Sequence, residues 1–450
     1  MTTVWCEQPI HRVATAIETG VVSVSEVVDS VLDRIATRDP VLNAYTTVFD
    51  ESARREADQA DRLIATGQYR GPLHGVPLSI KDLVDVAGAP TTCASRASDS
   101  SMARADARAV AHLRHAGAIV IGKCNLHEFA FGTTGEDSYF GPTLHPLDQT
   151  RSPGGSSSGS AVSVSTGMAF GSVGTDTGGS IRIPSAACGL VGLKPTFGEI
   201  SCDGVVPLAP SLDHVGPLTR CVADARLLFE TMRDGSSTGK HATVPVKQAL
   251  GCPRPFFLER LDDEIRASFE QALSRLQSAG WTIGDTAVHH AHYSPVVCLH
   301  LVLSEAAATH ARGLTERPNR YTDGVRLRLE LGRYVMGEDY ARAQHGRNLL
   351  SHAIDATLAD YDALVLPTLP IPAPRLATTT VDIGGVEEPL RNVMLRLTQL
   401  FNATGHPAVS LPCGLTTSGL PCGLQLIGAR NRTNHLLDVA ELCEAVLSEG

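Results

Sequence analysis

The chain has 450 residues, of which 43% are hydrophobic and 19% charged, a composition typical of a globular protein with a sizeable core. Its net charge of −10 favours neither a nucleic acid nor a membrane of anionic lipids as a partner. No 18 apolar residues run together, which predicts no membrane span, and the N-terminus lacks the basic start and apolar run of a secretory signal. The eleven cysteines are an odd number without paired spacing, so we expect free thiols and a reducing, cytoplasmic location.

The segment 8–66 carries helical signals. Ser23 followed by Glu26 is a candidate capping box, and valine, leucine and isoleucine then recur at helical spacing up to Ile35. A second helix is predicted over 51–66, ended by Gly67. We expect both helices to pack on the core and assign them no chemistry.

From residue 72 the pattern changes to alternating strands and helices. A short apolar strand is predicted over 76–80 and ends at Lys81, and a helix followed by a buried strand at 118–122 comes next. This alternation predicts an α/β fold with helices on both faces of the sheet. The segment 124–150 is irregular and rich in glycine and proline, so we expect it to line a pocket.

The rest of the chain continues the mixed pattern without an internal repeat. Helices are predicted at 222–233, 262–279 and 322–358 and at the C-terminus, and strands at 363–370, 406–412 and 420–429. The polar, turn-rich segment 234–248 is predicted to be a surface connection. We interpret residues 1–450 as one domain, with a core at about 72–220 and a peripheral helical and substrate region at about 234–360.

The first of two glycine–serine clusters, at 154–160, is open to three interpretations that involve no catalytic role for Ser156. A flexible linker would not run on into the small, apolar residues that follow, and the lysine-terminated pattern of a phosphate-binding loop is missing. Residues 155–159 also match G-x-S-x-G, which would make Ser157 a nucleophile. That motif requires a buried strand directly before it, and the preceding residues are polar and broken by proline.

The second cluster has a context that suits a nucleophile. A buried strand of small residues is predicted at 169–175, and a sharp turn through two glycines then leads to Ser180. The backbone N–H groups of Thr177, Gly178, Gly179 and Ser180 could point to one place and form an oxyanion hole. Taken alone, this fragment is also compatible with a tight turn and an idle serine.

Three segments together resemble the amidase signature family. They are GVPLSIKD with Lys81, SPGGSSSGSAV with Ser156 and GTDTGGSIRIPSAACGLVGLKPT with Ser180. Ser156 follows Lys81 by 75 residues and Ser180 follows Ser156 by 24, as in the family. The resemblance covers most of the chain and implies one amidase-signature domain with a mixed central β-sheet covered by helices on both faces.

The resemblance also implies a role for each matched residue. Ser180 would be the nucleophile that forms an acyl-enzyme, and Ser156, after a cis peptide bond from Gly155, would bridge Ser180 and Lys81. Ser157, Asp176 and Arg182 are expected to support the site. A lysine acts as a base only when neutral, and Lys81 follows an apolar strand that could bury and deprotonate it. This chemistry needs no metal or other cofactor.

Two histidine patterns could suggest other chemistry. His289, His290 and His292 have no cysteine or carboxylate nearby at ligand spacing, so we interpret them as a surface cluster. Asp213 and His214 could suggest a Ser–His–Asp triad, but they fall in a turn rich in proline and glycine and are interpreted as structural.

We therefore predict an amidohydrolase that cleaves the C–N bond of a small amide. The resemblance is strongest to enzymes acting on small polar amides, including urea-like and carboxybiuret compounds, and implies a homodimer. The alternative is the glutaminase-type A subunit of a tRNA-dependent amidotransferase, but the segment 320–328 lacks the closing Tyr-Gly typical of such subunits. A third interpretation, an inactive binding homologue, does not explain the intact Lys81, Ser156 and Ser180. Segments 125–145 and 290–400 are expected to select the substrate.

Overall fold

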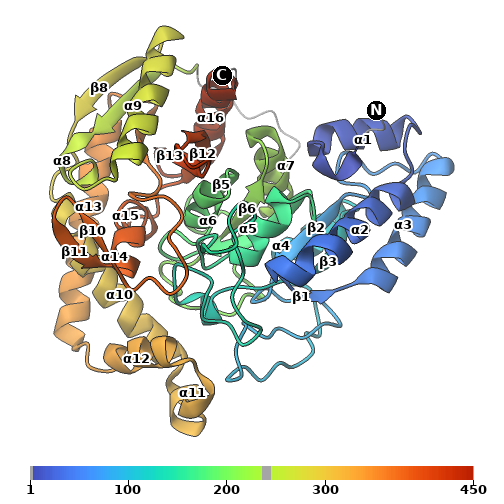
Figure 1. The fold of residues 1–450 in the computed structure, drawn as a ribbon, viewed down its shortest axis with the longest axis horizontal. Helices are drawn as coiled ribbons and strands as arrows, with labels where there is room; N and C mark the ends of the chain where they lie inside the picture. The colour runs from blue at the N-terminus through green and yellow to red at the C-terminus, as the bar shows by residue number, and fades with distance from the viewer. Residues whose placement is uncertain (1–3, 236–244, 449–450) are drawn as a thin grey trace.

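One large mixed sheet organises the structure, a computed structural model that describes residues 4–235 and 245–448 (Figure 1). Its eleven strands, in spatial order, are β1 (Tyr45–Val48), β3 (Ile119–Cys124), β2 (Pro77–Lys81), β4 (Gly171–Asp176), β6 (His214–Thr219), β5 (Val191–Lys194), β12 (Ala408–Leu415), β13 (Pro421–Ile427), β9 (Ala363–Pro367), β7 (Ala249–Pro253) and β8 (Thr282–Thr286). Strands β3, β2 and β4 are parallel to one another, and so are β9, β7 and β8. Between these two groups, each pair of neighbours from β4 through β6, β5, β12 and β13 to β9 is antiparallel. A separate hairpin consists of β10 (Thr380–Ile383) and β11 (Val386–Pro389).

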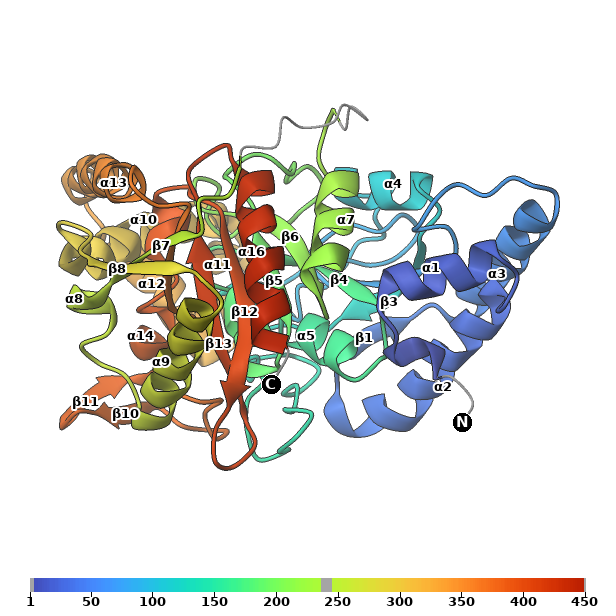
Figure 2. The same cartoon turned by 90° about the horizontal axis from the view of Figure 1, so that it is seen from above.

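Helices cover both faces of this sheet, as the sequence predicts. The helices are α1 (Ile10–Glu18), α2 (Val24–Leu42), α3 (Asp50–Ala65), α4 (Arg108–His115), α5 (Ser158–Ser165), α6 (Arg182–Ala187), α7 (Val222–Met232), α8 (Arg254–Phe257), α9 (Asp263–Ser278), α10 (Ser294–Thr309), α11 (Ala311–Glu316), α12 (Asp323–Gly332), α13 (Gly337–Leu358), α14 (Leu390–Leu395), α15 (Leu400–Ala403) and α16 (Thr433–Ser448). In β4, Gly171 faces Leu228 of α7, whereas Gly174 faces Ser157 and Ile181 on the opposite side. Helices α7 and α16 lie side by side on the first face (Figure 2), and α5 and α6 pack together against the second.

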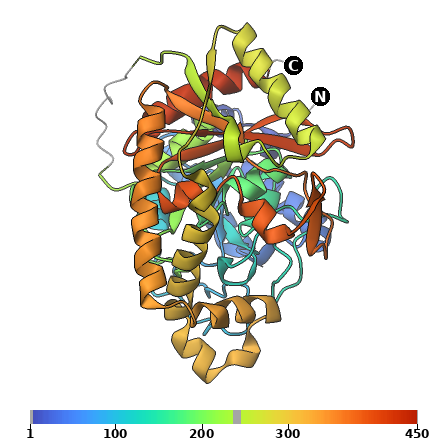
Figure 3. The ribbon, with the colours of Figure 1, turned by 90° about the vertical axis from the view of Figure 1, so that its left-hand side faces the viewer.

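Helices α10–α13 extend to one side of the sheet. Figure 3 shows these yellow and orange helices running away from the strands, with α11 and α12 farthest from the sheet. The sequence predicts one helical segment over 322–358, but the structure breaks it into α12 and α13. Gly332, the last residue of α12, lies so close to the Leu303 carbonyl of α10 that a Cβ atom there would be 2.1 Å from it.

Local sequence signals and the observed ends of the helices agree closely. Ser23 and Glu26 form the predicted capping box at the start of α2, and Gly67 follows α3 with a φ of +79°. The structure corrects two predictions: a strand, β1, lies within the segment predicted to be helical, and His214 begins β6 rather than lying in a turn. Among the residues that the structure describes, no helix is both long and apolar enough to cross a bilayer.

Two sequence predictions are left open. The surface connection at 234–248 falls mostly on residues outside the described ranges. The division into a core at about 72–220 and a peripheral region at about 234–360 stays a prediction. All eleven cysteines are free, as expected, and Cys202 is exposed.

Candidate active site

A buried lysine at the end of a central strand contacts two hydroxyl groups. Lys81 is the last residue of β2 and is fully buried. Its Nζ atom lies 2.8 Å from Ser156 Oγ and 2.8 Å from Oγ1 of Thr175, a residue of the neighbouring parallel strand β4. The structure thus brings two of the three predicted catalytic residues into direct contact and adds Thr175, which sequence reasoning missed.

The contacts of Lys81 differ from those of Lys123, a buried lysine on the neighbouring strand. Lys123 Nζ, on β3, lies 3.0 Å from the Asp82 carboxylate in a buried ion pair. Among the residues described, no carboxylate lies within ion-pair distance of Lys81. Burial lowers the pKa of Lys81 to about 7, although the charges of Asp176 and Asp213 act in the opposite direction. About half of the Lys81 side chains are therefore neutral at pH 7.

The loop that carries Ser156 is tightly packed against its neighbours. The peptide bond between Gly155 and Ser156 is cis, as predicted. A Cβ atom on Gly155 would lie 2.8 Å from the Gly135 nitrogen, so only glycine fits at this position. Ser157 N–H donates to the Ser180 carbonyl over 3.2 Å, which joins this loop to the second serine loop through the backbone.

Ser180 lies in a turn whose backbone is held by Thr398. Gly179 has a φ of +138°, and the Thr398 hydroxyl donates to the Gly178 carbonyl over 2.6 Å. A Cβ atom on Gly179 would lie 2.3 Å from the Thr398 hydroxyl oxygen. Ser180 is 6% exposed and lines a cavity together with Thr177 and Gly178. Within the described residues, the Ser180 and Ser156 hydroxyls are not hydrogen-bonded to each other.

A buried ion pair supports the turn from behind. Arg182 donates to both carboxylate oxygens of Asp176, with distances of 3.1 Å from Nε and 3.0 Å from Nη2. Asp176 also accepts the Ile181 N–H and the Asn402 amide, and Arg182 further donates to Asn402 and Gln425. Burial alone would raise the pKa of Asp176, but the Arg182 charge and these hydrogen bonds hold it well below its usual value. The predicted supporting pair therefore connects the turn to α15 and β13.

A second carboxylate reaches the same turn from the segment before β6. The Thr177 hydroxyl donates to Asp213 over 2.6 Å, and Asp213 also accepts the N–H groups of Leu208 and Ala209. Burial raises the pKa of Asp213 to about 6. The interpretation of Asp213 as structural stays a prediction, and its contact with a predicted oxyanion residue was not foreseen, because the two are 36 residues apart with no shared motif.

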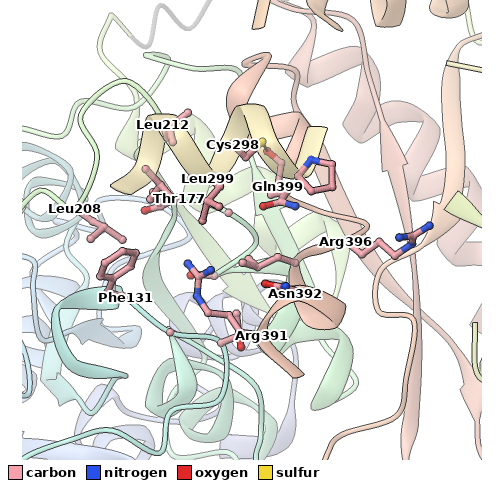
Figure 4. Close-up of a pocket in the computed structure, with 18 of the residues that line it drawn as sticks. Phe131, Thr177, Leu208, Leu212, Cys298, Leu299, Arg391, Asn392, Arg396 and Gln399 are labelled. Atoms are coloured by element: carbon pink, nitrogen blue, oxygen red, sulfur yellow. Dashed lines mark hydrogen bonds between the residues drawn. The ribbon is translucent and has the colours of Figure 1, made fainter. Parts of the chain in front are cut away.

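The cavity in front of Ser180 has a volume of about 340 Å³, within the range of small-molecule sites. Figure 4 shows three groups of residues around it. Residues 130–133 form one wall, and leucines 208 and 212 with α10 residues such as Leu299 form an apolar wall. The third wall comes from α14 and the residues after it, including Arg391, Asn392 and Gln399. Both segments expected to select the substrate, 125–145 and 290–400, thus contribute to the lining.

Comparison with known proteins agrees with this fold and these motifs. A family model described as "Amidase" matches residues 26–437. An "Amidase" of Pseudomonas putida is 38% identical over 428 residues, which cover 91% of this chain and 90% of that protein. The A subunit of the glutamyl-tRNA(Gln) amidotransferase of Geobacter sp. (strain M21) is 35% identical over 472 residues, which cover 96% of this chain and 95% of that protein.

Solved structures extend the similarity to the three-dimensional fold. A structure described as "Crystal structure of amidase" superimposes with a TM-score of 0.92 at 36% identity, covering 98% of this chain and all of that one. A structure concerning the origins of an s-triazine catabolic enzyme has a TM-score of 0.91 at 32% identity, covering 98% of both chains. From these matches along nearly its whole length, the chain belongs to the amidase family and is a hydrolase of amide C–N bonds.

Proposed function

We propose that Ser180 is the nucleophile of this hydrolase and that Lys81 activates it through Ser156. One observation carries the proposal: the buried amine of Lys81 lies 2.8 Å from Ser156 Oγ, and its hydrogen-bond partners among the described residues are both hydroxyl groups. A neutral amine has a free lone pair, which can accept the Ser156 proton over this distance. The backbone bond between Ser157 and Ser180 holds the two serine loops together.

In the proposed reaction, protons pass along the three side chains in both directions. Ser156 gives its proton to Lys81 and takes the proton of Ser180 as the Ser180 oxygen attacks the amide carbonyl carbon. The new C–O bond pushes the carbonyl electron pair onto oxygen, and its return breaks the C–N bond. The leaving nitrogen takes a proton back from Lys81 through Ser156. Water then hydrolyses the acyl-enzyme by the same relay.

The turn at 177–180 is the proposed oxyanion hole. The N–H groups of Thr177, Gly178, Gly179 and Ser180 would stabilise the negative oxygen of the tetrahedral intermediate. Thr398 holds the Gly178 carbonyl, and the pair of Asp176 and Arg182 holds the start of α6, so the donors are fixed before the substrate binds. Such pre-organised donors cost no rearrangement during the reaction.

The proposed substrate is a small amide of the urea-like or carboxybiuret type. The small size of the cavity supports this, as does the likeness to a structure concerning an s-triazine catabolic enzyme. The second candidate is the A subunit of a glutamyl-tRNA amidotransferase, which the Geobacter relative and a Thermotoga maritima structure with a TM-score of 0.79 favour. In that role the chain would release ammonia from glutamine inside a complex.

An ammonia-release screen separates the two candidates. Purified protein is assayed with primary amides, urea-like compounds and glutamine, alone and together with the other amidotransferase subunits. Release from a small amide by the chain alone supports the hydrolase. Activity on glutamine only in the presence of the other subunits would establish the second candidate instead. The predicted cytoplasmic location and homodimer stay predictions, and sedimentation of the purified protein tests the dimer.

A further inference from the structure

One arginine lies inside the cavity that Ser180 lines. Arg391 belongs to the short helix α14, and its side chain is only partly exposed. Figure 4 shows its guanidinium beside Phe131, and the central carbon lies 5.5 Å from the centre of that ring. The aromatic face and the guanidinium attract each other, which keeps the arginine at the cavity wall.

Nothing in the described parts of the chain neutralises this charge. Across residues 4–235 and 245–448, no carboxylate lies within ion-pair distance of Arg391, and its buried Nε has no hydrogen-bond partner. Glu388 lines the same cavity but is paired with Arg260. Arg328 lies nearby and is itself paired with Asp137 at 3.9 Å, so it supplies no counter-charge for Arg391. Burial and the Arg328 charge lower the pKa of Arg391 to about 10, so it stays protonated at neutral pH.

A second arginine of the same wall, Arg396, also has a buried Nε without a partner, but its Nη2 atom has partners within the chain, and it provides a comparison. The Arg396 guanidinium lies 4.3 Å from the Phe256 ring centre and donates to the Phe256 carbonyl over 2.9 Å. In Figure 4 it points away from the cavity, whereas Arg391 points into it. Partly buried charges are costly unless they are paired, so an unpaired guanidinium at the wall of a substrate cavity needs an anion from outside the chain.

The opposite wall of the cavity is apolar, so it suits an uncharged part of the ligand. Leu208, Leu212 and Leu299 offer apolar surface and no charge. We propose that Arg391 binds a carboxylate of the substrate, so that this enzyme acts on amides that carry a second, anionic end. The proposal rests on the proposed function, because it takes Ser180 as the place where the amide lies.

Matched pairs of ligands test the proposal without requiring turnover. Glutaramate is compared with glutaramide, and 4-carbamoylbenzoate with terephthalamide, because a carboxamide replaces the carboxylate at the same shape. Binding is measured by titration calorimetry on the Ser180→Ala variant, alone and combined with Arg391→Gln or Arg396→Gln. Charge-assisted hydrogen bonds predict that an acid binds about 10- to 100-fold more tightly than its diamide.

The preference should disappear with Arg391→Gln and persist with Arg396→Gln. Unchanged affinity for the diamide in the Arg391→Gln variant shows that the cavity is intact. Equal affinity for acid and diamide in the parent, no binding of either, or a preference that survives Arg391→Gln would overturn the inference. Tight binding of an acid that the wild-type protein never hydrolyses would instead contradict the proposed function and leave the inference standing.

Discussion

Replacing Lys81 by methionine removes the proposed base while keeping a side chain of similar length in the buried site. Since the amine is fully buried, burial lowers the pKa of Lys81 to about 7. An ordinary lysine, with a pKa of about 10.4, would be neutral in about 0.04% of molecules at pH 7, so the site gains about a thousandfold in available base. We expect Lys81→Met to lower the rate at which a fluorophosphonate labels Ser180 by about 10²- to 10⁴-fold, the usual contribution of a positioned base.

The role of Lys81 as a base also predicts how the labelling rate changes with pH. Because the neutral amine is the active form, the wild-type rate should rise with pH, half-maximal near pH 7 and about 100-fold below the plateau at pH 5. Lys81→Met and Lys81→Arg should both lose this rise, since a guanidinium cannot give up its proton in this range. The arginine variant is the control that keeps the positive charge but not the base.

The assay follows covalent labelling by a fluorophosphonate, which requires no knowledge of the natural substrate. Second-order labelling rates are measured from pH 5 to pH 9 for the wild type and both variants. Circular dichroism at each pH shows that the proteins remain folded. A Lys81→Met rate within about threefold of the wild type, or a rise near pH 7 that persists in this variant, would refute the reasoning about the base.

Two further substitutions test the turn that carries Ser180 and the effect of the Asp213 charge on the pKa of Lys81. Gly179→Ala should slow labelling by more than about 100-fold, because its Cβ would overlap the Thr398 hydroxyl. The control is Gly198→Ala, also at positive φ but with open space around it, which should label normally. Equal labelling rates for the two variants would contradict this prediction. Asp213→Asn removes a negative charge that raises the pKa of Lys81, so the midpoint of the rate–pH curve should move below pH 7. An upward shift of that midpoint would be inconsistent with the assignment.

How far the sequence predicts the fold depends on whether the signal is local. The capping box of Ser23 and the helix predicted at 262–279 rest on local signals, and the structure has both, the helix as α9. Strand β6 was missed because Gly216 and Pro217 interrupt its pattern. The interrupted part of the strand, at Gly216 and Pro217, pairs with β4 alone, because β5 pairs with β6 only at Leu218 and Thr219.

In the candidate site, too, local motifs could be predicted from the sequence, whereas contacts between distant segments could not. The motifs around Lys81, Ser156 and Ser180 are contiguous in the sequence, and their spacing is typical of the family. Thr175 becomes a partner of Lys81 only because β2 and β4 are adjacent and parallel, and no sequence motif predicts this contact. The sequence does not distinguish Arg391 from the other arginines, because its place at the cavity depends on how the fold positions α14.

The most direct test of the central claim is to map the serine that a fluorophosphonate modifies. Peptide mass spectrometry of the labelled protein should find the adduct on Ser180, and Ser180→Ala should prevent labelling. Ser157→Ala should still label on Ser180, because the variant keeps the Ser157 backbone N–H that bonds to the Ser180 carbonyl and loses only the side-chain bond to the Thr175 carbonyl. An adduct on Ser157, or labelling that survives Ser180→Ala, would contradict the account.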